Sequence, residues 1–163
     1  MNTSGMPRMH SAEHAADLAK RVRMHGAKVV FTNGVFDLLH PGHVRYLSDA
    51  RRLGGALIVG VNSDLSVHAI KGPDRPITPA EERAEVLLAL ACVDAVVIFD
   101  EETPDAIIKR VQPDVLVKGA DWELDSIVGR ETVEARGGRV VRIELAPGYS
   151  TTDLIRKVKA VAR

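Results

Sequence analysis

The chain has 163 residues, a length that allows one domain with a substantial hydrophobic core. Its 22 Lys and Arg residues balance its 22 Asp and Glu residues, which argues against broad electrostatic attraction to nucleic acid or to an anionic membrane. A single cysteine, Cys92, excludes an intrachain disulfide, and the lack of a signal-peptide or membrane-span pattern predicts a soluble, cytoplasmic protein.

Strand-like and helix-like segments alternate along the chain. Residues 1–10 are expected to form a disordered tail, and residues 11–25 carry apolar side chains at helical spacing. Five apolar runs predict β-strands, at residues 28–33, 56–62, 95–99, 115–118 and 139–143. The central runs are almost continuously apolar, which is typical of parallel strands that are covered on both faces.

Helical patterns follow the strands. Residues 44–53 form the first, with Pro41 in its opening turn. Residues 78–81 read Thr-Pro-Ala-Glu, which predicts a helix with the threonine as N-cap, the proline first and the glutamate completing a capping box. Residues 103–105 predict a similar start, and the last helix is expected over 151–161. This alternation predicts an α/β fold: a doubly wound, five-stranded parallel sheet with flanking helices, in one domain over 11–163.

Residues 32–43 carry the strongest local signal, Thr-Asn-Gly-Val-Phe-Asp-Leu-Leu-His-Pro-Gly-His, at the step from a strand to a helix. Gly34 and Gly42 allow the backbone to approach a ligand closely. His40 and His43 place two imidazoles beside the free backbone donors of a helix start. Such an arrangement suits a phosphate chain.

Polar residues also follow the other strands, and ligands of such sheets bind beyond the carboxyl ends of the strands. Residues 62–64 and the loop 71–76 follow the second strand. Residues 118–122 follow the fourth strand and residues 148–152 the fifth. The sequence therefore predicts that four loops converge on one phosphate- and base-binding site.

The sequence lacks the motifs of several other phosphate-, dinucleotide- and zinc-binding sites. The chain has no Walker phosphate loop, no G-x-G-x-x-G after the first strand and no pair of cysteines for zinc. Residues 10–14 match the H-x-x-E-H string of some zinc peptidases, which we interpret as a chance match at a helix start. No metal ligand is predicted, and His25 and His68 are interpreted as solvated surface residues.

Taken together, residues 32–43, the Lys-Gly-Ala-Asp-Trp segment at 118–122 and the Tyr-Ser-Thr-Thr segment at 149–152 resemble the H-x-G-H nucleotidyltransferase superfamily, with its Rossmann-like fold. Within it the chain is most similar to the heptose 1-phosphate adenylyltransferase domain of ADP-heptose synthases, over residues 28–158. Because only a helix and a tail precede the match, it resembles the stand-alone form. A separate sugar kinase would then supply the substrate.

The resemblance implies adenylyl transfer from ATP to a sugar 1-phosphate, with Mg²⁺ bound through the nucleotide phosphates, in a homodimer formed by residues 78–91 and the segment after Trp122. His40, His43 and Lys71 are the implied catalytic residues, and Asp37, Arg75 and Trp122 the substrate-binding ones. The implied nucleotide-binding residues are Asn33, Gly34, Val35, Phe36, Gly42, Lys118, Gly119, Asp121, Ser150, Thr151 and Thr152.

Alternatives stay open for single residues and for the function. Arg75 can pair with a carboxylate, Ser150 can cap its helix, Trp122 can pack, and Asp37 can hold its loop through backbone amides; Arg83 is interpreted as structural or interfacial. Cytidylyl transfer to glycerol 3-phosphate or a similar polyol phosphate is the second hypothesis, although the arginine that usually precedes the Ser-Thr-Thr stretch in those enzymes is missing. A non-catalytic nucleotide-binding module is the third.

Overall fold

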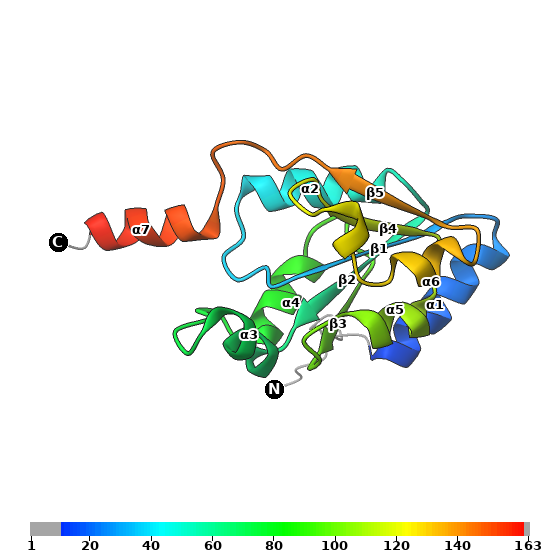
Figure 1. Cartoon of the computed structure of the whole chain (residues 1–163), viewed down its shortest axis with the longest axis horizontal. Coiled ribbons are helices and arrows are strands. Elements are labelled where there is room, and N and C mark those ends of the chain that lie inside the picture. Colours follow the sequence, from blue (N-terminus) through cyan, green and yellow to red (C-terminus); the bar gives the residue numbers. More distant parts are fainter. Residues whose placement is uncertain (1–10, 162–163) are drawn as a thin grey trace, which may run out of the picture.

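The computed structural model describes residues 11–161, and its centre is one parallel sheet (Figure 1). The strands are β1 (Val29–Gly34), β2 (Ala56–Asn62), β3 (Ala95–Phe99), β4 (Val115–Gly119) and β5 (Arg139–Ile143). They lie in the order β3-β2-β1-β4-β5, and every neighbouring pair is parallel. Each predicted strand agrees with the observed one to within a residue at either end, so the predicted five-stranded parallel sheet is confirmed.

Helices cover both faces of the sheet, as the doubly wound fold requires. They are α1 (Ala12–Met24), α2 (Pro41–Arg51), α3 (Asp64–Lys71), α4 (Ala80–Leu88), α5 (Asp105–Val111), a short 3₁₀ helix (Leu124–Ser126), α6 (Arg130–Glu134) and α7 (Thr151–Val161). One core cluster joins α1, α5 and α6 to the sheet through Ala15, Ile108 and Val133. The other joins α2 and α4 to the opposite face through Leu47 and Leu87. Alternate side chains of the buried strands supply both clusters, which explains their continuously apolar runs.

Two predicted helix caps are wrong by one residue. Pro79, not Thr78, is the N-cap of α4, and no side chain caps this helix. The backbone N–H of Thr78 instead donates to the carboxylate of Asp37 at 2.9 Å, so a tertiary contact holds Thr78 just outside the helix. Pro104, not Thr103, is likewise the uncapped N-cap of α5. The extended backbone of Pro79 suits an N-cap position, although its ring has no acceptor for the helix.

Two helices, α3 and α6, are additions to the predicted elements. The hydroxyl of Ser63 caps α3 by accepting a hydrogen bond from the N–H of Ser66 at 3.3 Å. Lys71, predicted on a loop, is the last residue of this helix and precedes Gly72, whose φ is 94°. Lys71 is therefore held at a helix end, close to the carboxyl ends of the strands.

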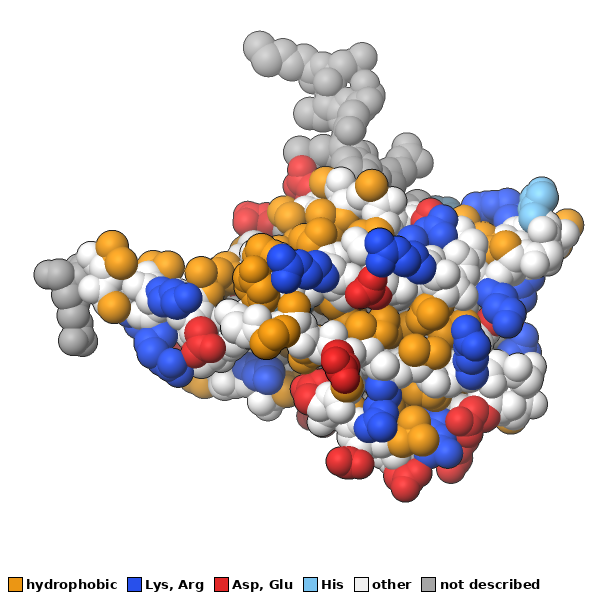
Figure 2. Space-filling view, turned by 90° about the horizontal axis from the view of Figure 1, so that it is seen from above, with side chains coloured by type: hydrophobic (Ala, Val, Ile, Leu, Met, Phe, Trp, Pro, Cys, Tyr) orange, Lys and Arg blue, Asp and Glu red, His pale blue; other side chains and the backbone are white. Residues whose placement is uncertain are grey.

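The last helix, α7, is confirmed at its predicted bounds. It extends away from the body of the molecule, and none of its residues is buried (Figure 1). Apolar side chains lie along it (Figure 2), among them Leu154 and Val158. No helix within residues 11–161 is long and apolar enough to cross a membrane. The predicted tail, residues 1–10, lies outside the described part of the chain.

Candidate active site

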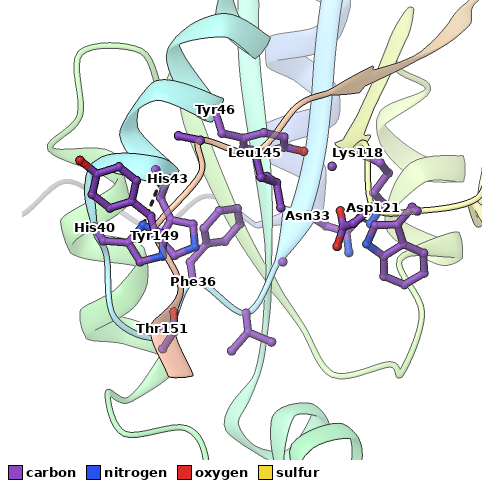
Figure 3. Close-up of a pocket in the computed structure, with 16 residues that line it drawn as sticks. Asn33, Phe36, His40, His43, Tyr46, Lys118, Asp121, Leu145, Tyr149 and Thr151 are labelled. Atoms are coloured by element: carbon purple, nitrogen blue, oxygen red, sulfur yellow. Dashed lines mark hydrogen bonds between the residues drawn. The ribbon is translucent and has the colours of Figure 1, made fainter. Parts of the chain in front are cut away.

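A cleft lies at the carboxyl ends of β1 and β4, where the strand order reverses direction. It consists of two adjoining cavities of about 270 and 650 Å³. Figure 3 shows the smaller one. The two cavities share a wall made of Asn33, Gly34, Val35, Phe36, His43, Lys118, Trp122 and Thr151. Five of these eight residues come from the stretch between the end of β1 and the start of α2, and the other three lie at the end of β4 or follow β4 and β5, so the predicted convergence of loops is observed.

The two histidines form a stacked pair at the start of α2. Their ring centroids are 3.8 Å apart and the ring planes differ by 14°. His40 has an extended backbone and is the N-cap, so its Nδ1 accepts a hydrogen bond from the N–H of His43 at 3.4 Å. Gly42 is required between them, because a Cβ there would lie 2.9 Å from the Cβ of Tyr149 and 3.0 Å from the His40 ring.

Burial keeps both imidazoles neutral near pH 7. Loss of solvent lowers the pKa of His43 to about 4, and the neighbouring His40 adds to the effect. Burial also lowers the pKa of His40. The Nδ1 atom of His43 is buried without a hydrogen-bond partner in residues 11–161. We assign the proton of each neutral ring to Nε2, because Nδ1 of His40 is already an acceptor and a proton on Nδ1 of His43 would bury an unpaired donor.

The low pKa of His43 predicts a specific loss of stability in acid. Between pH 6.5 and about 4 the unfolded chain binds a proton at His43 that the folded chain does not, so the free energy of unfolding must fall as the pH falls. From pH 7 to 4.5 we expect a loss of about 1 to 2 kcal/mol, allowing for partial exposure, that His43→Asn does not show. Urea unfolding over this pH range measures it, with His68→Asn, which removes an exposed imidazole, as the control. Equal pH dependence of the wild type and His43→Asn would contradict the assignment.

Lys118 stands where the two cavities meet. Its Nζ lies 2.5 Å from Oδ1 of Asn33 and 5.3 Å from the centroid of the Trp122 ring. Burial lowers its pKa to about 8, although Asp121 opposes the shift. Gly119 makes room for Asp121, since a Cβ there would lie 2.3 Å from Oδ1 of that carboxylate. The result is a largely buried amine, still mostly protonated at pH 7, between an amide and an indole.

The smaller cavity is closed at one end by apolar and aromatic side chains. Leu145, Ala146 and Tyr149 come from the segment after β5, and Tyr46 comes from α2. The Tyr149 ring stacks near the His40 ring, with centroids 5.9 Å apart. The hydroxyl of Tyr46 forms a buried hydrogen bond of 2.7 Å with the hydroxyl of Thr32 on β1. This end offers flat apolar surfaces of the kind that hold an aromatic ring.

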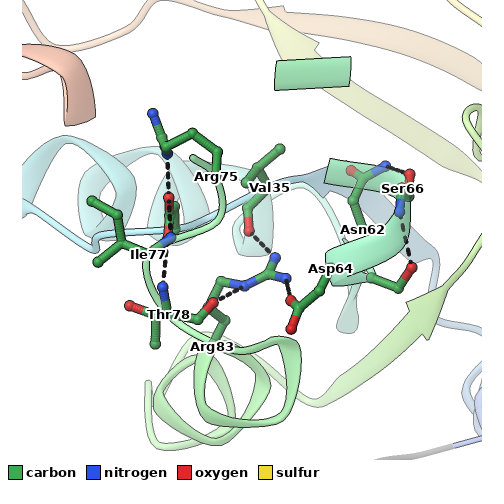
Figure 4. A network of polar contacts seen from close by, with 10 residues as sticks. Val35, Asn62, Asp64, Ser66, Arg75, Ile77, Thr78 and Arg83 are labelled. Atoms are coloured by element: carbon green, nitrogen blue, oxygen red, sulfur yellow. Dashed lines mark hydrogen bonds and ion pairs between the residues drawn. The ribbon is translucent and has the colours of Figure 1, made fainter. Parts of the chain in front are cut away.

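A polar network supports the floor of the cleft (Figure 4). The Asp37 side chain is 1% exposed and accepts from the backbone N–H groups of Ile77 and Thr78 at 2.9 Å and from Nε of Arg75 at 2.6 Å. Arg83, with a fully buried side chain, donates to the carbonyls of Val35 and Thr78 and to Asp64. The interpretations of Asp37 as a loop anchor and of Arg83 as structural are confirmed.

The structure places nearly all the predicted site residues on the cleft. His40, Gly42, Gly119 and Asp121 line the smaller cavity only, and Asp37, Lys71, Arg75 and Thr152 the larger only. Ser150 lines neither; its hydroxyl accepts from the N–H of Asp153 at 3.4 Å and caps α7. The binding roles of these residues stay predictions, because geometry alone assigns no ligand.

Some lining residues had no predicted role, although Asn62 belongs to one of the four segments that were predicted to converge on the site. Tyr46 lies one helical turn after His43, so helical spacing alone points to it. Asn62, Glu102 and Thr103 line the larger cavity beyond the ends of β2 and β3. Position after a strand was a signal for Asn62. Glu102 and Thr103 can be assigned to the cleft only when the order of the strands is known, because that order places the end of β3 beside the cleft.

The donor set of the cleft suits phosphate rather than a bare metal ion. Its shared wall offers imidazole, amine, amide and hydroxyl groups from His43, Lys118, Asn33 and Thr151. Among residues 11–161 no three His, Cys, Asp or Glu side chains are grouped so that they could hold a metal. A cation would therefore depend on oxygens that a ligand brings with it.

Comparison with known proteins agrees with this geometry. The cytidylyltransferase-like family matches residues 31–157. The chain is 51% identical over 146 residues to the bifunctional protein HldE of Syntrophotalea carbinolica, covering 90% of this chain and 30% of the relative. It is 54% identical over 138 residues to that of Citrifermentans bemidjiense, covering 85% and 28%. The chain thus spans less than a third of these relatives.

A solved structure shares the fold. The lipopolysaccharide core biosynthesis protein from Thermoplasma volcanium superposes with a TM-score of 0.64 at 30% identity. The superposition covers 74% of this chain and 99% of that protein. The match therefore includes almost the whole of the other chain.

Proposed function

Because this chain belongs to the cytidylyltransferase-like family, we propose that it transfers an adenylyl group from ATP to D-glycero-β-D-manno-heptose 1-phosphate, which gives ADP-heptose and pyrophosphate. The observation that carries the proposal is that His43, one ring of the stacked histidine pair, and Lys118 both line the wall that the two cavities share. A transferase for two substrates requires such a shared wall, since the transferred group must touch both. High identity to the HldE relatives supports the choice of nucleotide and sugar.

The reaction needs alignment and charge stabilisation more than proton transfer. An oxygen of the sugar phosphate, already anionic at neutral pH, attacks the α-phosphorus of ATP. The bond from that phosphorus to the bridging oxygen breaks, and pyrophosphate leaves with the bonding electrons. No general base is required, so the neutral Nε2–H donors of His40 and His43 act by stabilising charge on the transferred group.

The residues that line the two cavities suggest where each substrate lies. The apolar end of the smaller cavity, with Leu145 and Tyr149, suits the nucleobase. The larger cavity carries Lys71 and Arg75, which suit the phosphates of the two substrates. The α-phosphate then lies at the shared wall, against His43 and Lys118. This placement holds both polyanions in line for the transfer.

Further parts of the proposal concern the cofactor and partners. Mg²⁺ bound through the nucleotide phosphates would supply charge neutralisation. A sugar kinase provides the sugar 1-phosphate in the cytoplasm. The protein forms a homodimer, for which Val86 on α4, 50% exposed, and Val158 on α7, 61% exposed, offer apolar surface.

Pyrophosphate release over a grid of nucleoside triphosphates and sugar phosphates tests the function. We expect release with ATP and heptose 1-phosphate at a rate well above every other pair. Release with CTP and glycerol 3-phosphate alone would establish the cytidylyl alternative, which the family description favours. Nucleotide binding without release from any pair would establish a non-catalytic module. The identity of the product follows from mass spectrometry of the nucleotide sugar.

A further inference from the structure

The larger cavity has two chemically distinct parts. Its wall near β1 and β4 carries His43 and Lys118, which suit anions. Beyond β2 and β3 it carries Asn62, Glu102 and Thr103, and Lys71 and Arg75 from the segment after β2 line it as well. In the order β3-β2-β1-β4, the ends of β3 and β4 are three strand spacings apart, about 14 Å. A ligand with an anionic end and an uncharged polar end can therefore span the cavity with its anionic end against Lys118 and its polar end against Glu102.

The part beyond β2 and β3 is built as a fixed structure. Asn62 is 5% exposed, and its Nδ2 donates to the hydroxyl of Ser66 at 3.0 Å. That hydroxyl donates to the backbone carbonyl of Glu101 at 3.0 Å, which ties the segment after β3 to α3 (Figure 4). Glu102 follows directly, so this chain of hydrogen bonds positions its backbone. The amide oxygen of Asn62 accepts no hydrogen bond from residues 11–161 and is available to a ligand.

Glu102 has no structural partner that would explain it. Its carboxylate forms no ion pair or hydrogen bond within residues 11–161, although Lys71 and Arg75 line the same cavity. A free carboxylate repels phosphate and accepts hydrogen bonds from hydroxyl groups. With the Asn62 oxygen and the Thr103 hydroxyl, it forms an acceptor-rich surface. Sugar hydroxyls, each a donor, match this surface.

We propose that Glu102, assisted by Asn62 and Thr103, binds the hydroxyl groups of the acceptor and selects a polyhydroxylated sugar phosphate over a simple alcohol phosphate. This inference rests on the proposed function, because it describes how that function's acceptor is recognised. The acceptor phosphate lies near Lys118 and His43, and the far hydroxyls of the sugar reach Glu102. Glu102 is thus a specificity-determining residue rather than a catalytic one.

Calorimetric binding of heptose 1-phosphate and of glycerol 3-phosphate tests the inference, with and without saturating α,β-methylene-ATP. Glu102→Gln keeps the size of the side chain and removes its charge, so we expect 10- to 100-fold weaker binding of the heptose phosphate, as for a lost charged hydrogen bond. Binding of glycerol 3-phosphate should change less than twofold. Thr103→Val should weaken the binding of the heptose phosphate by about 3- to 10-fold.

Glu101→Gln is the matched control, because the adjacent glutamate is also exposed but does not line the larger cavity. Its binding constants should equal those of the wild type. Wild-type affinity of Glu102→Gln for heptose 1-phosphate would overturn the inference, and so would equal losses for both ligands. The binding comparison needs no turnover, so a failure of pyrophosphate release in every wild-type reaction would contradict the proposed function separately.

Discussion

His43→Ala is expected to lower kcat by about 100- to 1,000-fold while the fold is retained. The imidazole lies on the wall that both cavities share, and its neutral Nε2–H is a donor for charge that develops on the transferred group. Alanine cannot replace this donor, and water in its place is not held in a fixed orientation. Steady-state pyrophosphate release with ATP and heptose 1-phosphate measures the effect.

Two comparisons separate a chemical role for His43 from a structural one. His68→Asn removes an exposed imidazole from α3 and should leave kcat unchanged. His43→Asn retains a donor of similar reach and should recover part of the lost rate. Thermal unfolding of His43→Ala should show a change of only a few degrees, since the ring is not fully buried. A rate within threefold of the wild type would remove His43 from the reaction.

The parts of the fold that could be predicted depend on local patterns. The strands are continuous apolar runs such as residues 56–62, and burial on both faces leaves few other interpretations. The histidine pair is also local, because His40 and His43 lie three residues apart at a helix start. The predicted cap of α4 failed for the opposite reason. Thr78 is bound by Asp37, 41 residues away, and no local pattern contains that contact.

The site was predictable to the extent that each residue follows its own strand. Lys118 and Asp121 were found in this way, because parallel strands end at one edge. Glu102 was not found, since its place beside the cleft follows only from the position of β3 next to β2. The role of Ser150 as a cap was left open by the sequence, because capping and phosphate binding use the same residue types at a helix start.

Asp37→Ala is expected to lower the free energy of unfolding by about 3 to 5 kcal/mol, the usual cost of removing one partner from a buried ion pair. Burial raises the pKa of Asp37, but the N–H groups of Thr78 and Ile77 together with Arg75 lower it further, so the net shift is downward. A carboxyl group whose pKa is lowered in the folded state stabilises the fold at pH values above its pKa in the unfolded chain. This stabilisation is lost only as the pH falls through the pKa of the folded state. At pH 7 the full effect is present. Urea unfolding at pH 7 measures it.

Asp49→Ala is the matched control for this prediction. Asp49 also pairs with an arginine, Arg52, but both side chains are about half exposed or more, so removal should cost less than 1 kcal/mol. A similar loss for both variants would show that burial of Asp37 does not determine its contribution.

The contacts of Asp37 are also expected to affect the reaction, because Phe36 lies next to Asp37 in the chain and contacts His43. Phe36 has a φ of 49°, a left-handed conformation that costs a non-glycine residue about 1 kcal/mol or more. Hydrogen bonds to the residues before and after Phe36 hold it in this conformation. Arg83 donates to the carbonyl of Val35, and the 75–78 segment donates to the carboxylate of Asp37. The ring of Phe36 meets the His43 ring edge-on at 5.4 Å. Loss of Asp37 frees Phe36 to relax and His43 to turn, so Asp37→Ala should lose kcat even at temperatures where it is fully folded.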